Sequence, residues 1–260
     1  MSRFPTSRHR GYGLLGECTP RRGGELGAIF EPRLEVRGGY RRPCHGVGQI
    51  APPSSESCEV ISLFPTVVWK QQLAAAEHEA HRAAVLGVLH AGPSRLPALS
   101  AGESWQSGTV LHRCPELRAL VARFERTAGA ALASLHIAAA SFQVTGCWAN
   151  ANARSASHPI HHHPNNFLSG VYYVSVGPGA DTINFHDPRP QTGIIRPPVT
   201  ELSAQNTDLV VVQVKDGTLL LFPAYLDHSV GPNKSPDPRI SVSFNVMFTD
   251  YTETMSPPLW

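Results

Sequence analysis

Four histidines lie close together in HPIHHHPNNFLSGVYYV, residues 158–174. Three interpretations of this stretch are open: a metal site, a pH-sensitive loop, or a polar turn without chemistry. Side chains of an extended segment alternate between two faces, so we expect His161 and His163 on one side and His162 on the other. Two imidazoles on one side can bind a metal ion if a third ligand comes from elsewhere. We expect His158 to lie outside such a site.

A further histidine and an arginine follow near strand ends later in the chain. His228 comes after the apolar run DGTLLLFP, and Arg239 and Ser241 share one face of the segment RISVSF. An arginine that faces into the mouth of a small β-barrel needs an anionic partner, because an unpaired buried charge is costly. A carboxylate could accept two parallel hydrogen bonds from the guanidinium, and the Ser241 hydroxyl could donate a further hydrogen bond to the same carboxylate.

The composition allows a large core and gives no sign of binding to nucleic acid or a membrane. The 260 residues suit one large domain, with 42% hydrophobic and 16% charged residues. The net charge of +2 does not suggest the clustered basic face that those partners usually need. No window approaches the roughly 18 apolar residues of a membrane span, and we find no secretory signal. The five cysteines form no CxxC pair, so we expect a cytoplasmic protein without a disulfide framework.

The elements that must position these residues are helices first and strands afterwards. Residues 1–56 are rich in Arg, Gly, Pro and Ser, and we interpret them as a disordered or loosely ordered extension. Apolar residues at helical spacing predict helices near residues 73–92 and 115–135. From about residue 140, six or more short β-rich runs follow with no helix between them. This order predicts a mainly β antiparallel sandwich or barrel with N-terminal helices.

Five motifs in a fixed order resemble one enzyme family. WANAN, HPIHHHPNNFLSGVYYV, INFHDPRP, DGTLLLFPAYLDHSVGPN and RISVSFN are similar to segments of the Fe(II)- and 2-oxoglutarate-dependent oxygenases, and most similar to a bacterial and phage group. The resemblance covers about residues 59–250 and implies a double-stranded β-helix, a cupin-like jelly roll. It implies an oxygenase domain at residues 57–260, with helical support at about 70–136 and a jelly-roll core at about 140–250.

Within this resemblance each candidate site residue has an expected role. His161 matches the first metal ligand and His228 the distal one. Arg239 matches the residue that binds the 5-carboxylate of 2-oxoglutarate, with Ser241 as its helper. Tyr173, which has the same strand parity as His161, is expected to donate a hydrogen bond to the co-substrate.

The sequence departs from the family pattern at the second metal ligand, where most members have a carboxylate. His163 could complete a three-histidine site, and its position two residues after His161 needs no further assumption about the fold. Alternatively, Asp187 in NFHDPRP could bring a carboxylate from another strand. A third alternative is a two-histidine site completed by water, with His163 only lining the pocket.

Four residues are candidates for the substrate pocket. Trp148, Asn150 and Asn152 belong to the WANAN motif, where they could equally pack and cap the strand. Arg189 lies in the long segment after INFHDP and could meet an acidic substrate group, or be an ordinary surface charge.

The function implied by the resemblance is that of an oxygenase that uses Fe(II), 2-oxoglutarate and O2 and releases succinate and CO2. We expect it to hydroxylate an unactivated C–H bond of an amino acid, peptide or secondary metabolite. The oligomeric state stays open, with a homodimer as one alternative. Two other functions compete: a three-histidine cupin-type dioxygenase or isomerase without 2-oxoglutarate, and a non-catalytic jelly-roll binding protein. The cupin-type enzyme has no need for Arg239, which therefore discriminates it from the oxygenase.

Overall fold

The computed structural model describes residues 61, 63–91, 95–138, 141–189, 195 and 197–252. The chain divides into two compact units, one of Met1–Pro65 with Arg196–Thr207 and one of Thr66–Ile195 with Asp208–Trp260. In the first unit the described residues form no helix or strand. All the elements discussed below belong to the second unit, and the predicted extension at residues 1–56 lies outside the described residues.

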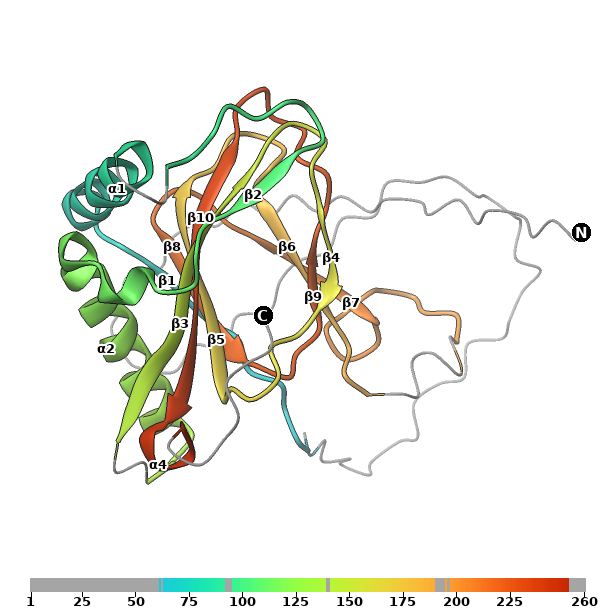
Figure 1. The fold of residues 1–260 in the computed structure, drawn as a ribbon. Helices are drawn as coiled ribbons and strands as arrows, with labels where there is room; N and C mark the ends of the chain where they lie inside the picture. Colours follow the sequence, from blue (N-terminus) through green and yellow to red (C-terminus); the bar gives the residue numbers. More distant parts are fainter. Residues whose placement is uncertain are drawn as a thin grey trace, which may run out of the picture. The chain divides into compact units, whose positions relative to one another are not determined.

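Two antiparallel sheets and a layer of helices make up the second unit (Figure 1). The major sheet has the order β1-β8-β5-β10-β3-β2, and the minor sheet the order β4-β9-β6-β7. In chain order the elements are β1 (Trp69–Gln72), α1 (Ala75–His90), β2 (Ser104–Gln106), the 3-10 helices η1 (Leu111–Arg113) and η2 (Pro115–Leu117), α2 (Arg118–Ser134), β3 (Phe142–Asn152), β4 (His158–His161), β5 (Leu168–Ser175), β6 (Thr182–His186), β7 (Leu209–Gln213), β8 (Thr218–Pro223), β9 (His228–Val230), β10 (Arg239–Phe248) and α4 (Thr249–Thr252).

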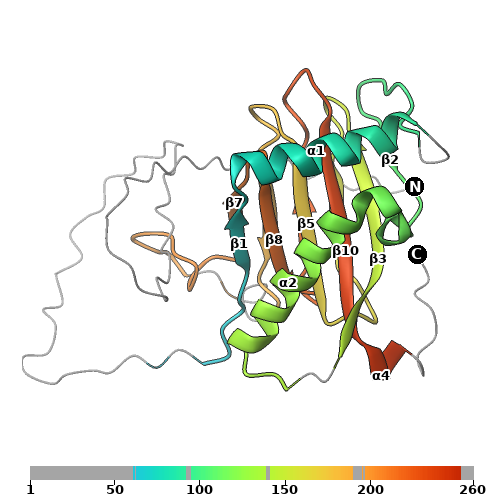
Figure 2. The ribbon, with the colours of Figure 1, turned by 90° about the vertical axis from the view of Figure 1, so that its left-hand side faces the viewer.

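Helices α1 and α2 lie across one face of the major sheet (Figure 2). Val85 and Leu89 of α1 are fully buried, four residues apart on one side of the helix. On α2, Leu120 and Phe124 have the same spacing, and the Phe124 ring stacks on Phe244 of β10 with 3.9 Å between ring centroids. The helices therefore cover the outer face of the sheet with a continuous apolar core.

The central strands of the major sheet are buried on both faces. On β5, Tyr172 lies in the core beneath the helices, whereas Val171 and Tyr173 lie in a second core between the two sheets. On β8, Leu221 lies in the core beneath the helices and Leu220 in the core between the sheets. A strand covered on both sides needs an uninterrupted apolar run, which is why GTLLLFP lacks the alternation of a half-exposed strand.

The predicted mainly β fold with N-terminal helices is confirmed, but one local expectation is wrong. The shared parity expected for His161 and Tyr173 requires one strand that contains both residues. Instead β4 ends at His161, the chain turns through Asn165 with φ of 60°, and β5 begins at Leu168 in the other sheet. The parity shared by His161 and Tyr173 therefore has no structural meaning. The strand β4 is only four residues long, too short for its pattern to reveal it.

Gly170 on β5 should tolerate no side chain. A Cβ atom there would contact the ring of Phe244 and lie 2.9 Å from the carbonyl oxygen of Leu220. We expect Gly170→Ala to lower the free energy of unfolding by about 1–3 kcal/mol, as measured by urea denaturation. Gly87→Ala is the matched control, because Gly87 is exposed on α1 with nothing within 4 Å, and it should stabilise the helix by up to about 1 kcal/mol. Equal stability of Gly170→Ala and the parent would contradict the packing described.

Candidate active site

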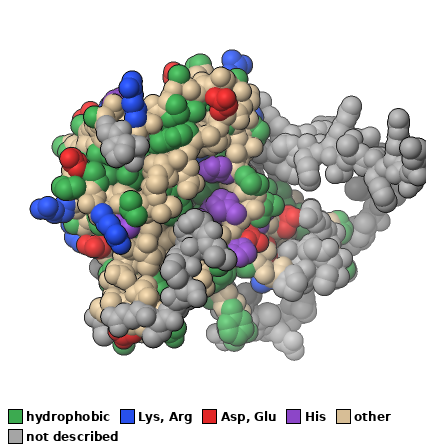
Figure 3. Space-filling model, in the orientation of Figure 1, with side chains coloured by type: hydrophobic (Ala, Val, Ile, Leu, Met, Phe, Trp, Pro, Cys, Tyr) green, Lys and Arg blue, Asp and Glu red, His purple; other side chains and the backbone are tan. Residues whose placement is uncertain are grey.

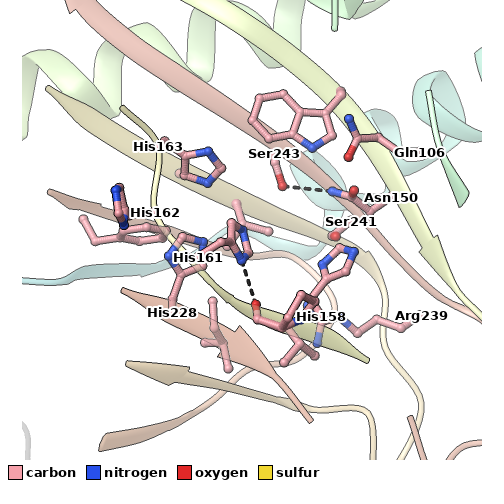
Figure 4. A pocket seen from close by; sticks show the side chains of 17 residues that line it. Gln106, Asn150, His158, His161, His162, His163, His228, Arg239, Ser241 and Ser243 are labelled. Atoms are coloured by element: carbon pink, nitrogen blue, oxygen red, sulfur yellow. Dashed lines mark hydrogen bonds between the residues drawn. The ribbon is translucent and has the colours of Figure 1, made fainter. Parts of the chain in front are cut away.

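The imidazoles of His161, His163 and His228 come together between the two sheets (Figure 4). One ring nitrogen from each lies within 4.8 Å of the others. The ring centroids are 4.2 Å apart for His161 and His228, and 5.2 Å apart for each pair with His163. In the described part of the chain this cluster includes no carboxylate. Its nitrogen donors suit a first-row transition metal ion.

Backbone hydrogen bonds bring these three residues together from distant parts of the chain. In the antiparallel pair β4–β9, His161 lies directly opposite His228. His163 lies just beyond β4, and its backbone N–H donates to the carbonyl of Ala224 at 2.9 Å. These contacts hold the segment after β4 against the segment before β9, and so keep the three histidines close together.

Two further hydrogen bonds fix the orientation of the rings. Nδ1 of His161 lies 2.9 Å from the carbonyl oxygen of Pro159, and Nδ1 of His228 lies 2.9 Å from that of Leu226. A carbonyl oxygen can only accept, so Nδ1 is the donor in each ring, and in the neutral form of the ring Nε2 keeps its lone pair. Metal-binding histidines usually donate the other ring N–H to a carbonyl or a carboxylate in this way, which fixes the orientation of the ring.

Burial keeps two of the rings in the neutral form that metals require. It lowers the pKa of His163 to about 3 and that of His228 to about 4, and the neighbouring histidines act in the same direction. Both imidazoles are therefore neutral near pH 7, with the lone pair available.

His162 is outside the cluster and pairs with Asp227. Its Nδ1 donates to Asp227 Oδ1 at 2.8 Å, and both side chains are about half exposed. The backbone carbonyl of Asp227 also accepts from the N–H of His186 at 2.9 Å. Since His162 separates two of the clustered histidines and Asp227 precedes the third, this pair ties together the two segments that carry the cluster.

Arg239 is a buried cation for which the described residues supply no anion. The side chain is 3% exposed, Nη1 donates to the carbonyl of Thr182 at 3.2 Å, and Nε has no hydrogen-bond partner among the described residues. Burial lowers the pKa of its guanidinium. The guanidinium carbon lies 5.2 Å from the ring centroid of Tyr173, a cation–π contact that offsets only part of the cost of burial.

Tyr173 supplies a second unused hydrogen-bonding group beside Arg239. Its side chain is fully buried, and the described residues offer its hydroxyl no partner. Burial raises the pKa of this phenol to about 12, although the charge of Arg239 opposes the shift. The hydroxyl therefore keeps its proton and can donate to an anion.

A cavity of about 320 Å³ joins the histidine cluster to Arg239. Its minor-sheet wall includes His158, which was expected to lie outside the site, and burial lowers the pKa of that ring to about 4. The major-sheet wall includes Asn150, Ser241 and Ser243. Histidine side chains also gather near the centre of the face seen in Figure 3.

Of the predicted pocket residues, Trp148 and Asn150 line this cavity. Asn152 does not: it borders a much smaller adjoining cavity of about 10 Å³, together with Arg239. Its amide nitrogen donates to Ser104 Oγ at 2.9 Å.

Asp187 and Arg189 bind each other instead of joining the site. The Arg189 guanidinium donates to both carboxylate oxygens of Asp187, with distances of 2.7–3.2 Å. These hydrogen bonds lower the pKa of the Asp187 carboxyl. Neither residue is part of the described cavity wall. The local sequence did not predict this pairing, because Asp187 was a candidate metal ligand and Arg189 a candidate partner of an acidic substrate group.

Gln106 and Ser243 also line the cavity, although the sequence argument did not select them. Ser243 shares the alternating strand face of Arg239 and Ser241 in the sequence, but it was not selected as a site residue. Gln106 could not have been found from the sequence, because it comes from β2, a strand of three residues about forty positions before Trp148.

The comparisons with known proteins agree with this geometry. Residues 146–245 match the family model described as "Putative 2OG-Fe(II) oxygenase". The resemblance inferred from the motifs is therefore confirmed over this segment. No curated protein sequence matches the chain.

Solved structures similar to the chain include three with TM-scores above 0.5. The non-heme alpha ketoglutarate dependent epimerase SnoN from nogalamycin biosynthesis has 17% identity and a TM-score of 0.52, covering 75% of this chain and 89% of its own. The carbocyclase SnoK of the same biosynthesis has 18% identity, the same coverage and the same TM-score. AviO1 from Streptomyces viridochromogenes Tue57 has 14% identity and a TM-score of 0.51, covering 74% of this chain and 93% of its own. At these identities the likeness shows the fold alone and confirms the predicted jelly roll.

The lowered histidine pKa values predict a loss of stability in acid for the metal-free protein. In the unfolded chain the pKa returns toward its ordinary 6.5, so the unfolded state binds protons that His163 and His228 refuse in the folded state. Stability should therefore be fully present above about pH 6.5 and fall as the pH is lowered toward 4 and 3. Urea denaturation of chelator-treated protein at a series of pH values measures this slope. His163→Asn should make it shallower, and a parent stability that rises on acidification would refute the assignment.

Proposed function

We propose, from the premise that residues 146–245 belong to the Fe(II)- and 2-oxoglutarate-dependent oxygenases, that the protein hydroxylates an unactivated C–H bond of an amino acid, peptide or secondary metabolite. One observation carries the proposal: the buried Arg239, with no anionic partner in the described residues, borders the same cavity as the three clustered imidazoles. A metal site and a carboxylate site in one cavity suit a co-substrate that binds both.

The donor set fits Fe(II), with His161, His163 and His228 as the proposed ligands. Imidazole is a common ligand of iron in proteins, and three protein ligands leave coordination positions for other molecules. Two of the rings are aimed by backbone carbonyls and need no rearrangement to offer Nε2. We favour His163 over Asp187 as third ligand, because Asp187 is engaged by Arg189.

The inner end of the cavity fits the distal carboxylate of 2-oxoglutarate. We propose that Arg239 binds this carboxylate, with hydrogen bonds from Ser241 and Tyr173. A carboxylate would supply the charge that the described residues leave unmatched and partners for the unused Arg239 Nε and Tyr173 hydroxyl. When bound, Fe(II) and 2-oxoglutarate supply the oxidising chemistry, in which O2 and the co-substrate give succinate, CO2 and an oxygen atom for the substrate.

The chain's own part is to hold these groups and to exclude water. The core between the sheets, with Val171, Ile183 and Phe222, lines part of the cavity with apolar side chains. Such a dry environment strengthens the attraction between Arg239 and a carboxylate. It also shelters a reactive centre from solvent.

Hydroxylation is one of several outcomes that this fold supports. SnoN is described as an epimerase and SnoK as a carbocyclase, and SnoN has been crystallised with Fe3+, alpha ketoglutarate and nogalamycin RO. These names support a small organic substrate for the present chain. Product mass decides among the outcomes, since hydroxylation adds an oxygen atom, epimerisation changes no mass and ring closure removes two hydrogens.

The competing functions have no use for Arg239. A cupin-type enzyme without 2-oxoglutarate, or a binding protein, would leave a buried cation with no purpose and a cost in stability. No helix among the described residues is long and apolar enough to span a membrane. A cytoplasmic location stays part of the proposal, in keeping with the free thiols of Cys114 and Cys147.

The central test is anaerobic addition of Fe(II) and 2-oxoglutarate, which should produce a visible metal-to-ligand charge-transfer band. Arg239→Ala should weaken 2-oxoglutarate binding by at least about thirtyfold, because a buried charged hydrogen bond is lost. Arg118→Ala, an exposed arginine of α2, is the matched control and should bind as the parent does. Metal binding without the band would favour the cupin-type alternative, and no metal binding the non-catalytic one.

The ligand assignment is tested by separate substitutions. His228→Ala should abolish Fe(II) binding measured by anaerobic titration, whereas the exposed His136→Ala should not affect it. His163→Asp should keep metal binding and some activity, because it restores the carboxylate that most family members have. Asp187→Ala should leave metal binding unchanged. Unaltered binding in His228→Ala, or loss of binding in Asp187→Ala alone, would show that the ligands are assigned wrongly.

A further inference from the structure

We propose that the outer end of the cavity, formed by Gln106 and Asn150, binds an uncharged substrate group that carries an N–H or O–H donor, namely an amide or a hydroxyl. This inference rests on the proposed function, because it takes the inner end of the cavity to hold the co-substrate. It adds the chemical class of the group that the enzyme recognises.

The first support is a row of polar side chains that crosses the major sheet. In the strand registers, Gln106 of β2 lies opposite Asn150 of β3, which lies opposite Ser241 of β10, which lies opposite Tyr173 of β5. Side chains at matched positions of neighbouring strands point to the same face and are separated by one strand spacing, about 5 Å. The four residues therefore form one continuous line of uncharged hydrogen-bonding groups.

Burial increases steadily along this row. Gln106 is exposed, Asn150 is 5% exposed, Ser241 is 2% exposed and Tyr173 is fully buried. Arg239 lies at the buried end, against the Tyr173 ring. The co-substrate proposed for Arg239 would occupy that end, so the Gln106 end is left for the substrate, where it can enter from solvent.

The second support is an unused acceptor on Asn150. Its Nδ2 donates to Ser243 Oγ at 3.0 Å, whereas its Oδ1 is buried and has no partner among the described residues (Figure 4). A buried acceptor without a hydrogen bond is costly, and such atoms are rare in folded proteins. A substrate group with an N–H or O–H would supply the missing donor, and the neighbouring Gln106 amide can both donate and accept.

The composition of the cavity wall argues against a charged group at this end. Its described lining contains Arg239 and five histidines but neither Asp nor Glu. An ammonium group would find no counter-ion beside Arg239 and a metal ion. A carboxylate would face the unsatisfied Oδ1 of Asn150, which repels it. A neutral donor and acceptor pair has neither difficulty.

Trp148 adds an apolar wall beside the row. It lies opposite Ser243 in the β3–β10 register, is 6% exposed and lines the cavity. Its ring centroid is 5.6 Å from that of His163. A substrate group bound by Asn150 would therefore lie beside the Trp148 ring, on the side of the proposed metal site. The substrate carbon bonded to that group would then face the metal site.

The experiment uses the full-length protein with Zn(II) and 2-oxoglutarate, which cannot oxidise, and saturation-transfer NMR of four probes. N-acetylglycinamide represents the amide, glycerol the hydroxyl, propionate an anion and tetramethylammonium a cation. We expect saturation transfer to at least one neutral probe, and which of the two binds identifies the source of the donor. We expect Asn150→Leu and Gln106→Met, which remove the amide groups at similar side-chain size, to weaken that probe about tenfold.

Gln143→Met is the matched control, because Gln143 lies on β3 outside the cavity and its exposed amide donates to Thr252. It should bind the probe as the parent does. Preference for a charged probe, or transfer to none of the four, would overturn the inference. So would a loss of 2-oxoglutarate affinity in Asn150→Leu and Gln106→Met with unchanged probe binding, since the row would then serve only the co-substrate.

The two proposals fail in different ways. If the parent gives no charge-transfer band with Fe(II) and 2-oxoglutarate, the oxygenase function itself is wrong. If the band forms but neither neutral probe binds, only the inference about Gln106 and Asn150 is wrong.

Discussion

The site depends on one constraint, the alternation of side chains along strands that are buried on both faces. On β10, Val242 and Phe244 pack beneath the helices, while Arg239 and Ser241 face the cavity between the sheets. The same backbone thus supplies the core and the site, and the apolar layer holds the polar face in place. A shift of one residue in register would exchange the two faces and bury the polar groups under α1 and α2.

The polar face of the major sheet carries hydrogen-bonding capacity that the described residues leave unused. Arg239 Nε, the Tyr173 hydroxyl and Asn150 Oδ1 are buried without partners among them. Each such group lowers stability unless a ligand satisfies it. Arg239 and Asn150 line one cavity, and Tyr173 contacts Arg239. Such a grouping is typical of a binding site, where the ligand completes the hydrogen bonding that the fold leaves open.

The minor sheet contributes the histidines through very short strands. β4 and β9 contain four and three residues, so they have little stability of their own. The pairing of His161 with His228 is reinforced by the His163–Ala224 backbone hydrogen bond and by the His162–Asp227 pair. This exposed contact contributes little energy to the fold as a whole. Its value is local, because it joins the two segments that must approach each other for a metal ion to bind.

The sequence alone determined the order of helices and strands, the jelly-roll class and the residues that could bind a metal ion or a carboxylate. These features depend on local periodicity and on motifs that keep their order, such as the alternation of RISVSFN. Only the tertiary structure decided which side chains share the cavity. It brought in His158 and Gln106 and paired Asp187 with Arg189, away from the histidine cluster. It also paired His162 with Asp227, sixty-five positions later. Contacts of this kind depend on how short strands pair across the molecule, and strands of three or four residues are too short for their pattern to specify a partner.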